Sequence, residues 1–236
     1  MIKLTKTQIR NYNKTKTNKK NLAYANKILI SIFDLDKTIT KVDCEGLFYK
    51  TAFKKGLITR AILNKFRQFH KDYNKGRFNA YLHFKFQNTV ITKYKLKTKQ
   101  KFIKFFINKF IKKNIYTYIF KQLKKKPLAI ISTSSNELMA TAVNKILLKN
   151  KHIIYTSKHN KQKGFKEINH GINKVHNIKI WLKQHTITNY KTEFYTDSEN
   201  DYPLLQAANK RYIINPNEKL LSKSKLFENR TILILK

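Results

Sequence analysis

The fold of this chain is decided by one stretch, Ile28-Leu29-Ile30-Ser31-Ile32-Phe33-Asp34-Leu35-Asp36-Lys37-Thr38-Ile39-Thr40. An apolar run leads into two aspartates one residue apart, Asp34 and Asp36, which predicts a buried strand that ends in carboxylates. Because strand side chains alternate between two faces, we expect both aspartates to point the same way. A short apolar run is typical of a parallel sheet, whose ligands bind at the carboxyl ends of the strands. Two like charges this close favour a metal ion or acid–base chemistry.

The chain is strongly basic. Its 236 residues carry a formal net charge of +38, which predicts binding to polyanions. Only 6 of the 51 basic residues are Arg, however, whereas nucleic-acid sites favour the planar fork of Arg. An excess of Lys, Asn and Ile with 5 Gly and 3 Pro is typical of an AT-rich genome. We therefore expect a solvated basic surface that binds nucleic acid only non-specifically.

Acidic residues are scarce, and they gather at two places. The chain has only 13 Asp and Glu. Seven of them lie in two short windows, the first with Asp34, Asp36, Asp43 and Glu45 and the second with Asp197, Glu199 and Asp201. Against this background such grouping is not expected by accident, so both windows are candidate functional sites.

The single cysteine and the hydropathy pattern restrict where the protein works. Cys44 excludes an internal disulfide and a multi-cysteine zinc site, and it fits a reducing compartment. No apolar run approaches the roughly 18 residues of a membrane-spanning helix. Residues 1–26 are basic and acid-free and lack the apolar stretch of a secretory signal, so we expect an N-terminal tail, with a transit peptide as the alternative. We predict a soluble, cytoplasmic protein.

The length fits one core domain with an insert. Apolar residues at three- and four-residue steps predict that 47–110 is a helical cap inserted between two core segments, 27–46 and 111–236. The basic aromatic segment 98–123 has two interpretations, a helix lying on an anionic membrane or a helix packing on the core, and we favour the second.

Further strands are predicted at several places along the core. Apolar runs that end in polar residues occur at 128–131, 152–155, 191–196 and 211–214, with helical patterns at 136–148, 174–184 and 203–208 between them. This alternation predicts an α/β fold with a doubly wound parallel sheet whose strand ends share one crevice. The Lys- and Asn-rich part of 150–172 is expected to form turns and a hairpin.

Four short segments together resemble the motifs of the haloacid dehalogenase superfamily. Phe33-Asp34-Leu35-Asp36-Lys37-Thr38 resembles its DxDxT first motif, Ile131-Ser132 its second, Lys174 its third and Asp197-Ser198-Glu199-Asn200-Asp201 its fourth, in the family's order. The segment 195–205 is similar to the DSxxDxPLL signature of the phosphoserine-phosphatase-like branch. The resemblance covers about residues 27–222. It implies a Rossmann-like doubly wound parallel core with a helical cap inserted after the first motif.

The resemblance also implies a phosphomonoester hydrolase that works through an aspartyl-phosphate. Asp34 would attack phosphorus, and Asp36 would protonate the leaving oxygen and then activate water. Mg²⁺ would be held by Asp34, the backbone carbonyl of Asp36 and Asp197, with Asp201 in support.

Two further residues would bind the phosphate group. The resemblance implies that Ser132 donates a hydrogen bond to a phosphate oxygen and that Lys174 neutralises it. Taken alone, Ser132 is more often a helix N-cap and Lys174 more often a surface lysine. Asp43 stands where related enzymes carry an acidic residue just inside the cap, so it is a candidate substrate contact or an N-cap.

The substrate is expected to be a small phosphorylated metabolite. Phosphoserine, a sugar phosphate and a lipid phosphate head group remain open, as does the oligomeric state. Three arginines of the cap are candidates to hold an anionic part of the substrate: Arg60, Arg67 and Arg77. The alternatives are a basic nucleic-acid-binding protein and a polynucleotide-end phosphatase on the same fold.

Overall fold

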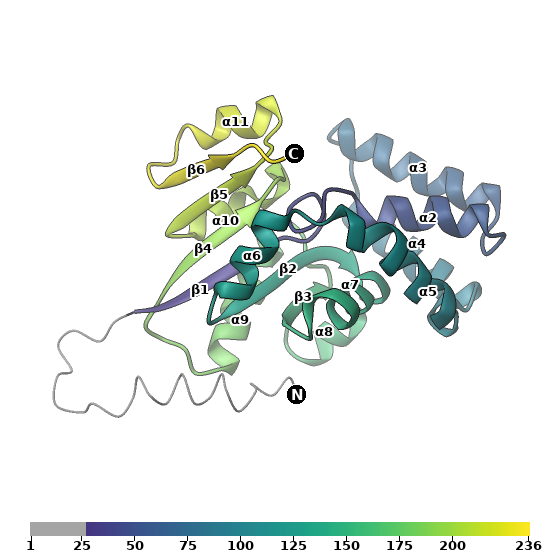
Figure 1. Ribbon diagram of the computed structural model, residues 1–236, viewed down its shortest axis with the longest axis horizontal. Coiled ribbons are helices and arrows are strands. Elements are labelled where there is room, and N and C mark those ends of the chain that lie inside the picture. The colour runs from purple at the N-terminus through teal and green to yellow at the C-terminus, as the bar shows by residue number, and fades with distance from the viewer. Residues whose placement is uncertain (1–26) are drawn as a thin grey trace.

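The computed structural model describes residues 27–236, and the predicted tail, 1–26, lies outside the described residues (Figure 1). The described chain contains a six-stranded sheet in the order β3-β2-β1-β4-β5-β6. Every neighbouring pair of strands is parallel. The strands are β1 (Ile28–Phe33), β2 (Ala129–Asn136), β3 (His152–Thr156), β4 (Tyr190–Thr196), β5 (Lys210–Ile214) and β6 (Arg230–Leu233).

The strand order places β1 at the switch point of the sheet. From β1 the chain adds β2 and β3 on one side and β4, β5 and β6 on the other. In open α/β sheets the crevice at such a reversal, outside the carboxyl ends of the strands, is where ligands bind. The loop that follows Phe33 therefore opens into this crevice.

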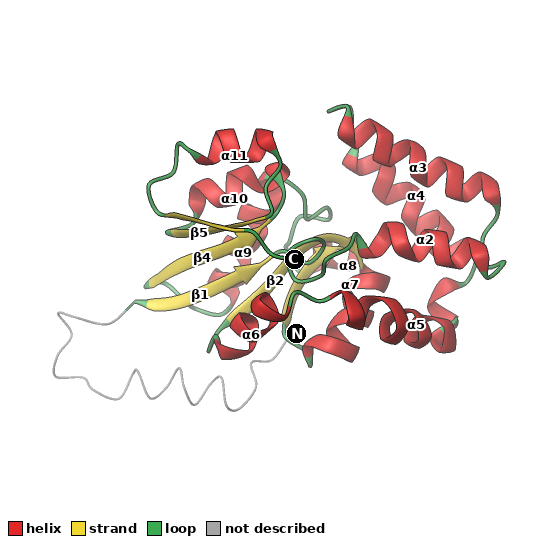
Figure 2. Ribbon diagram, turned by 45° about the horizontal axis from the view of Figure 1, so that its top comes forward, coloured by secondary structure: helices red, strands yellow, loops and turns green. Residues whose placement is uncertain are grey.

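Side chains of the strands alternate between two apolar clusters, one on each face of the sheet. Ile32 belongs to one cluster and Phe33 to the other, and both are fully buried. Burying a side chain of this size contributes about 1.5–3 kcal/mol. Helices α6 (Thr117–Lys125) and α7 (Glu137–Val143) cover the face of Phe33, while α9 (Ile172–Gln184), α10 (Tyr202–Ala207) and α11 (Glu218–Ser224) cover the other (Figure 2). The predicted α/β fold with a doubly wound parallel sheet is confirmed.

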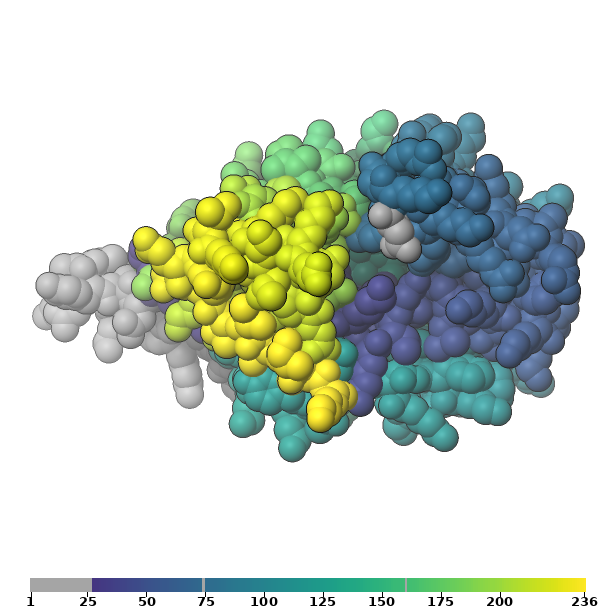
Figure 3. Space-filling model, turned by 90° about the horizontal axis from the view of Figure 1, so that it is seen from above, coloured from purple at the N-terminus to yellow at the C-terminus, as the bar shows by residue number. Residues whose placement is uncertain are grey.

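The helices between β1 and α6 form a separate layer, which we call the cap. They are α2 (Cys44–Lys54), α3 (Arg60–Asn74), α4 (Ala80–Lys93) and α5 (Gln100–Phe106), followed by a π-helical stretch, Ile107–Ile111. Helix α2 begins inside the segment predicted as core, because Asp43 caps it by accepting from the N–H of Gly46. An isolated antiparallel β-bridge pairs Thr40, before the cap, with Ile115, where the chain re-enters the core. Seen from above, the segment after β1 lies between the cap and the C-terminal part of the core (Figure 3).

The basic aromatic segment packs its rings inward. Phe106 is fully buried, and its ring lies 5.3 Å from the ring of Phe48 on α2. Phe102 and Phe110 are partly buried in the same cluster, while Phe105 remains exposed. This geometry supports the interpretation of a core-packing helix. Among residues 27–236, no helix is long and apolar enough to cross a membrane.

Three local predictions differ from the structure. The hairpin expected within 150–172 is wrong, because β3 pairs in parallel with β2 and leads into α8 (Lys158–Gln162). Strand β2 extends through the hydroxyl cluster to Asn136, so those hydroxyls lie on the strand and not after it. Strand β6 was not predicted, although it begins the apolar run at 232–235; it lies at the edge of the sheet, and its side chains are mostly exposed.

Candidate active site

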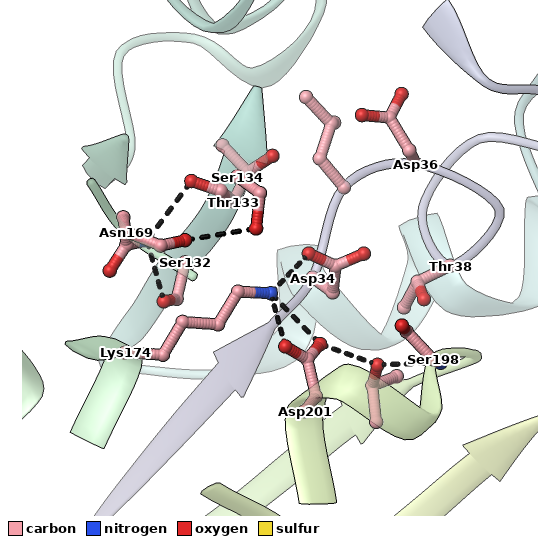
Figure 4. Close-up of polar contacts among 12 residues, drawn as sticks. Asp34, Asp36, Thr38, Ser132, Thr133, Ser134, Asn169, Lys174, Ser198 and Asp201 are labelled. Carbon is pink, nitrogen blue, oxygen red and sulfur yellow. Dashed lines mark hydrogen bonds and ion pairs between the residues drawn. The ribbon is translucent and has the colours of Figure 1, made fainter. Parts of the chain in front are cut away.

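A buried lysine joins two aspartates at the carboxyl ends of the strands. Lys174, on α9, is 2% exposed. Its Nζ lies 2.8 Å from Oδ1 of Asp34 and 2.8 Å from the carboxylate of Asp201 (Figure 4). The hydroxyl of Thr196, at the end of β4, donates to Oδ2 of Asp201 at 2.7 Å. The first, third and fourth predicted motifs therefore converge on one cluster.

The charges of this cluster do not balance. Burial raises the pKa of Asp34 well above its ordinary value, although the attraction of Lys174 opposes this effect. Burial disfavours the charge of Lys174, but Asp201 and Asp34 outweigh it and raise the pKa of the lysine. Lys174 is therefore an ammonium group that faces more carboxylate charge than it can neutralise.

Asp197 is tied to the first motif through Thr38. The Thr38 hydroxyl donates to Oδ1 of Asp197 at 3.1 Å, and the backbone N–H of Asp197 donates to Oγ1 of Thr38 at 3.0 Å. Burial, reinforced by the nearby charge of Asp201, raises the pKa of Asp197 to about 6. A third carboxylate thus crowds the same edge of the sheet.

The donor set fits a hard divalent cation. Within residues 27–236, no three side chains of His, Cys, Asp or Glu form a cluster that could hold a metal ion. The predicted set differs from such a cluster, because it consists of the carboxylates of Asp34 and Asp197 and the backbone carbonyl of Asp36. All three are oxygen donors of the kind that Mg²⁺ prefers. The carboxylates of Asp34, Asp197 and Asp201 lie close together, and Lys174 is the ammonium group beside them. The negative charge that remains is charge that a divalent cation would offset.

Asp36 lies beyond Asp34, on the side away from Lys174 (Figure 4). Its carboxylate accepts the backbone N–H of Cys44 at 2.8 Å and the hydroxyl of Ser135. Burial, with the charge of Asp43, raises the pKa of Asp36 above its ordinary value. A raised pKa favours the protonated form that a general acid requires. Strand β1 ends at Phe33, so Asp34 and Asp36 are positioned by the loop after the strand and not by the alternation of strand side chains. Both aspartates nevertheless line the same cavity.

The second motif, Ile131-Ser132, lies within β2, directly before three residues that line the cavity. Ser132 is fully buried, and its hydroxyl oxygen accepts from the amide of Asn169 at 3.1 Å. The same amide donates to the backbone carbonyl of Thr133 (Figure 4). Ser132 is absent from the cavity lining, whereas Thr133, Ser134 and Ser135 line it. The hydroxyl groups that face the cavity therefore come from the three residues after Ser132.

The cavity, with a volume of about 200 Å³, lies between the sheet edge and the cap. The cap contributes nine of its lining side chains: Glu45, Phe69, His70, Tyr73, Phe78, Ala80, His83, Phe84 and Gln87. The candidate Asp43 also lines it and lies 3.4 Å from Nε2 of His70. No arginine of the described chain lines it, so Arg60, Arg67 and Arg77 are not placed to hold a substrate there.

One cap residue reaches across to the fourth motif. The hydroxyl of Tyr73 lies 3.2 Å from Oγ of Ser198 and accepts from the side-chain amide of Asn200. Tyr73, Asn169, His83 and Glu45 were not predicted as site residues. The only sequence signal among them was Glu45, whose carboxylate belonged to the first acidic window.

Comparisons with known proteins identify the family of this chain and solved structures with a similar fold. A model of the haloacid dehalogenase-like hydrolase family matches residues 32–206. A histidinol-phosphatase from Neisseria meningitidis serogroup C (strain 8013) is 26% identical over 215 residues, covering 83% of this chain and 94% of that protein. A protein of unknown function from Bordetella pertussis Tohama I has a similar structure, with a TM-score of 0.76 and 16% identity over 89% of this chain and 99% of that one. A phosphoserine phosphatase, solved as an analogue of its phospho-aspartyl intermediate, gives a TM-score of 0.54 and 13% identity over 89% of this chain and 95% of that one.

Proposed function

The chain belongs to the haloacid dehalogenase-like hydrolase family, and on that premise we propose that it is a Mg²⁺-dependent phosphatase that hydrolyses phosphomonoesters through an aspartyl-phosphate on Asp34. The family predicted from the four motifs is thereby confirmed, and both relatives with named activities are phosphatases. The observation that carries the proposal is the contact of Lys174 with Asp34 and Asp201 at the edge of a cavity that Asp36 also lines.

In the proposed first step, a carboxylate oxygen of Asp34 attacks phosphorus. Oδ1 of Asp34 accepts from Lys174, which leaves Oδ2 for the attack. Lys174 remains charged and neutralises an oxygen of the incoming phosphate. Asp34, the carbonyl of Asp36 and Asp197 would hold Mg²⁺, with Asp201 in support, and the bound ion would supply further charge neutralisation.

Asp36 acts as the general acid in the first step and as the general base in the second. As the bond from phosphorus to the substrate oxygen breaks, Asp36 gives its proton to that oxygen. It then accepts a proton from water while the water oxygen attacks phosphorus, which releases inorganic phosphate and restores Asp34. The contacts to the N–H of Cys44 and the hydroxyl of Ser135 hold the carboxyl group in one orientation for both tasks.

The phosphate group would bind between Lys174 and the end of β2. We retain Ser132 in this proposal, because its oxygen only accepts from Asn169 and its own O–H is not used in that contact. The adjacent Thr133 lines the cavity and would contribute to phosphate binding beside Ser132. Asp43 remains a proposed substrate contact on the cap side.

The volume of the cavity supports a small substrate. Drug-sized ligands occupy pockets of about 300–1,000 Å³, and this one has about 200 Å³. A small phosphorylated metabolite fits this volume better than the end of a polynucleotide does. The relative named a histidinol-phosphatase makes histidinol phosphate the first substrate to include in a panel.

The test is hydrolysis of p-nitrophenyl phosphate by the purified protein. We expect turnover that EDTA abolishes and added Mg²⁺ restores. Asp34→Asn should be inactive, while the matched cap variant Asp72→Asn, at a residue outside the cavity lining that contacts Gln68 and Arg77, should retain activity. Turnover that survives EDTA, or activity in Asp34→Asn, would contradict the proposal.

A further inference from the structure

Three consecutive residues at the end of β2, 133–135, line the cavity. In a regular strand they could not, because successive side chains point to opposite faces. The ladder between β2 and β3 pairs Ser132 with Ile154, is then interrupted, and resumes at Asn136. Irregularities of this kind redirect side chains and are frequent beside active sites. The interrupted stretch therefore lets successive hydroxyl groups of β2 reach the cavity.

The side chain of Asn169 bridges the two strands at this interruption. Asn169 lies in the loop before α9 and is fully buried. Its Nδ2 donates to the backbone carbonyl of Thr133 at 3.0 Å and to that of Ile154 at 3.1 Å. The same nitrogen donates to Oγ of Ser132 (Figure 4). The amide thus joins β2 to β3 where their backbones do not pair.

The partners of this amide fix its orientation. Backbone carbonyls only accept hydrogen bonds, so the group that faces them is the NH₂ and not the oxygen. Oδ1 of Asn169 accepts from Nδ2 of Asn177 at 3.0 Å, and Oδ1 of Asn177 accepts from the backbone N–H of Lys166. An aspartate would lack the donors and a leucine would lack both donor and acceptor. Among side chains of this shape, only Asn can donate to β2 and accept from Asn177.

The same contacts connect the end of β2 with the helix that carries Lys174. Asn177 is fully buried and lies three residues after Lys174 on α9, so the two side chains project from the same side of the helix. On the other side of Asn169, the hydroxyl of Ser134 donates to its backbone carbonyl at 2.9 Å. A chain of hydrogen bonds therefore runs from the residues that follow the second motif to the helix of the third.

We propose that Asn169 is a positioning residue of the reaction: it holds the irregular end of β2 so that the hydroxyls there and Lys174 bind the same phosphate group. This inference rests on the proposed function and adds a residue that none of the four motifs contains. Asn169 is absent from the cavity lining, so it acts through its neighbours and does not touch the substrate. Without its amide, two buried carbonyls would lose their donor, and the end of β2 would shift to satisfy them.

The test separates phosphate binding from stability. The probe is inorganic phosphate, the product of the proposed reaction, whose inhibition constant is measured against p-nitrophenyl phosphate at a temperature where each variant is folded. Asn169→Ala should raise this constant about 2- to 10-fold, which corresponds to one hydrogen bond. It should lower kcat/KM about 10- to 100-fold, because a misplacement of about 1 Å can cost about 100-fold. A residue with a structural role alone would lower the midpoint of thermal unfolding and leave the inhibition constant of the folded enzyme unchanged.

The matched control is Asn144→Ala. Asn144 is another buried asparagine whose Nδ2 donates to a backbone carbonyl, that of Lys151, and it lies outside the cavity lining. This variant should lose thermal stability and keep both kinetic constants. Asn177→Ala is the second variant, because it removes the contact to Oδ1 of Asn169 and leaves the donors to β2 in place. It should raise the inhibition constant by a smaller factor, and it decides the matter if Asn169→Ala does not fold.

The outcomes separate this inference from the proposed function. If the wild type hydrolyses p-nitrophenyl phosphate, and the folded Asn169 and Asn177 variants bind phosphate as the wild type does, the positioning role is wrong and the phosphatase assignment stands. If the wild type shows no turnover, the proposed function itself fails. Equal losses in Asn144→Ala would mean that any buried asparagine has this effect, which would overturn the specific role of Asn169.

Discussion

Nζ of Lys174 lies 2.8 Å from Oδ1 of Asp34, and both side chains are buried beneath the cavity. Removing one partner of a buried ion pair leaves an uncompensated charge, which typically costs about 3–5 kcal/mol. Replacing Lys174 would leave two buried carboxylates without this partner, since Lys174 also pairs with Asp201.

We therefore predict that Lys174→Met lowers the free energy of unfolding of the metal-free protein by about 3 kcal/mol and kcat by at least about 100-fold. Urea unfolding in EDTA and steady-state kinetics with Mg²⁺ measure the two effects. The control Lys219→Met removes the exposed pair with Glu199, and it should change stability by less than about 1 kcal/mol. Wild-type kcat in Lys174→Met would refute the proposed role of the lysine.

Tyr73 is predicted to hold the cap in its observed position against the fourth motif. Its hydroxyl contacts Ser198 and Asn200 in the fourth-motif loop. Because a hydrogen bond contributes about 0.5–1.5 kcal/mol net, Tyr73→Phe should lower kcat/KM about 2- to 10-fold. Stability should change little, since the side chain is 38% exposed. Tyr118→Phe, which removes an exposed hydroxyl from α6, is the matched control. Unchanged kinetics in Tyr73→Phe would show that the contact has no role in turnover.

His152 makes stability depend on pH. Burial, with the charges of His185 and Lys151, lowers its pKa from 6.5 to about 4 in the folded protein. Between about pH 6.5 and pH 4, the unfolded chain binds a proton at this residue and the folded chain does not, so stability falls as pH falls through this window. Above pH 6.5 this histidine contributes no pH dependence.

The expected size of this effect is on the order of 2 kcal/mol between pH 7.5 and pH 4.5. Urea unfolding across that range should show a shallower loss of stability in His152→Gln than in the wild type. His159→Gln alters an exposed histidine of α8 and should retain the wild-type slope. Parallel curves for His152→Gln and the wild type would rule out this histidine as the source.

The parts of the site that the sequence predicted lie at the ends of buried strands. Asp34 follows β1 and Asp197 follows β4, and a parallel sheet brings such ends to one edge whatever the details of packing. Lys174 was found through the family motif, and its burial between Asp34 and Asp201 is a tertiary property that no local pattern contains.

The remaining differences come from long-range contacts. The contact of Ser132 with the amide of Asn169, 37 residues further along the chain, was not predicted. Tyr73 reaches Ser198 across 125 residues. Strand β6 pairs with β5 through its backbone, and the apolar run at 232–235, which begins in this strand, was not recognised as a strand. Side-chain pairing at such separations is set by packing, which periodicity does not encode.

The two aspartates of the first motif are predicted to have separate roles, and this division is the central claim. Asp36 makes its own contacts with Cys44 and Ser135, so replacing its carboxylate leaves Asp34 and Lys174 in place. Asp36→Asn lacks the general acid and base, and the loss of such a group typically lowers the reaction rate about 10²–10⁴-fold. An activated aryl ester depends less on the acid in the first step, while the second step still needs the base. Phosphate should therefore accumulate on Asp34.

The decisive measurement is intact-protein mass spectrometry of Asp36→Asn and Asp34→Asn after incubation with p-nitrophenyl phosphate and Mg²⁺. We predict one added phosphoryl group on Asp36→Asn, located at Asp34 by peptide mapping, and none on Asp34→Asn. Equal residual turnover in the two variants, with no phosphoryl group on either, would mean that the two carboxylates are structural and would contradict the account.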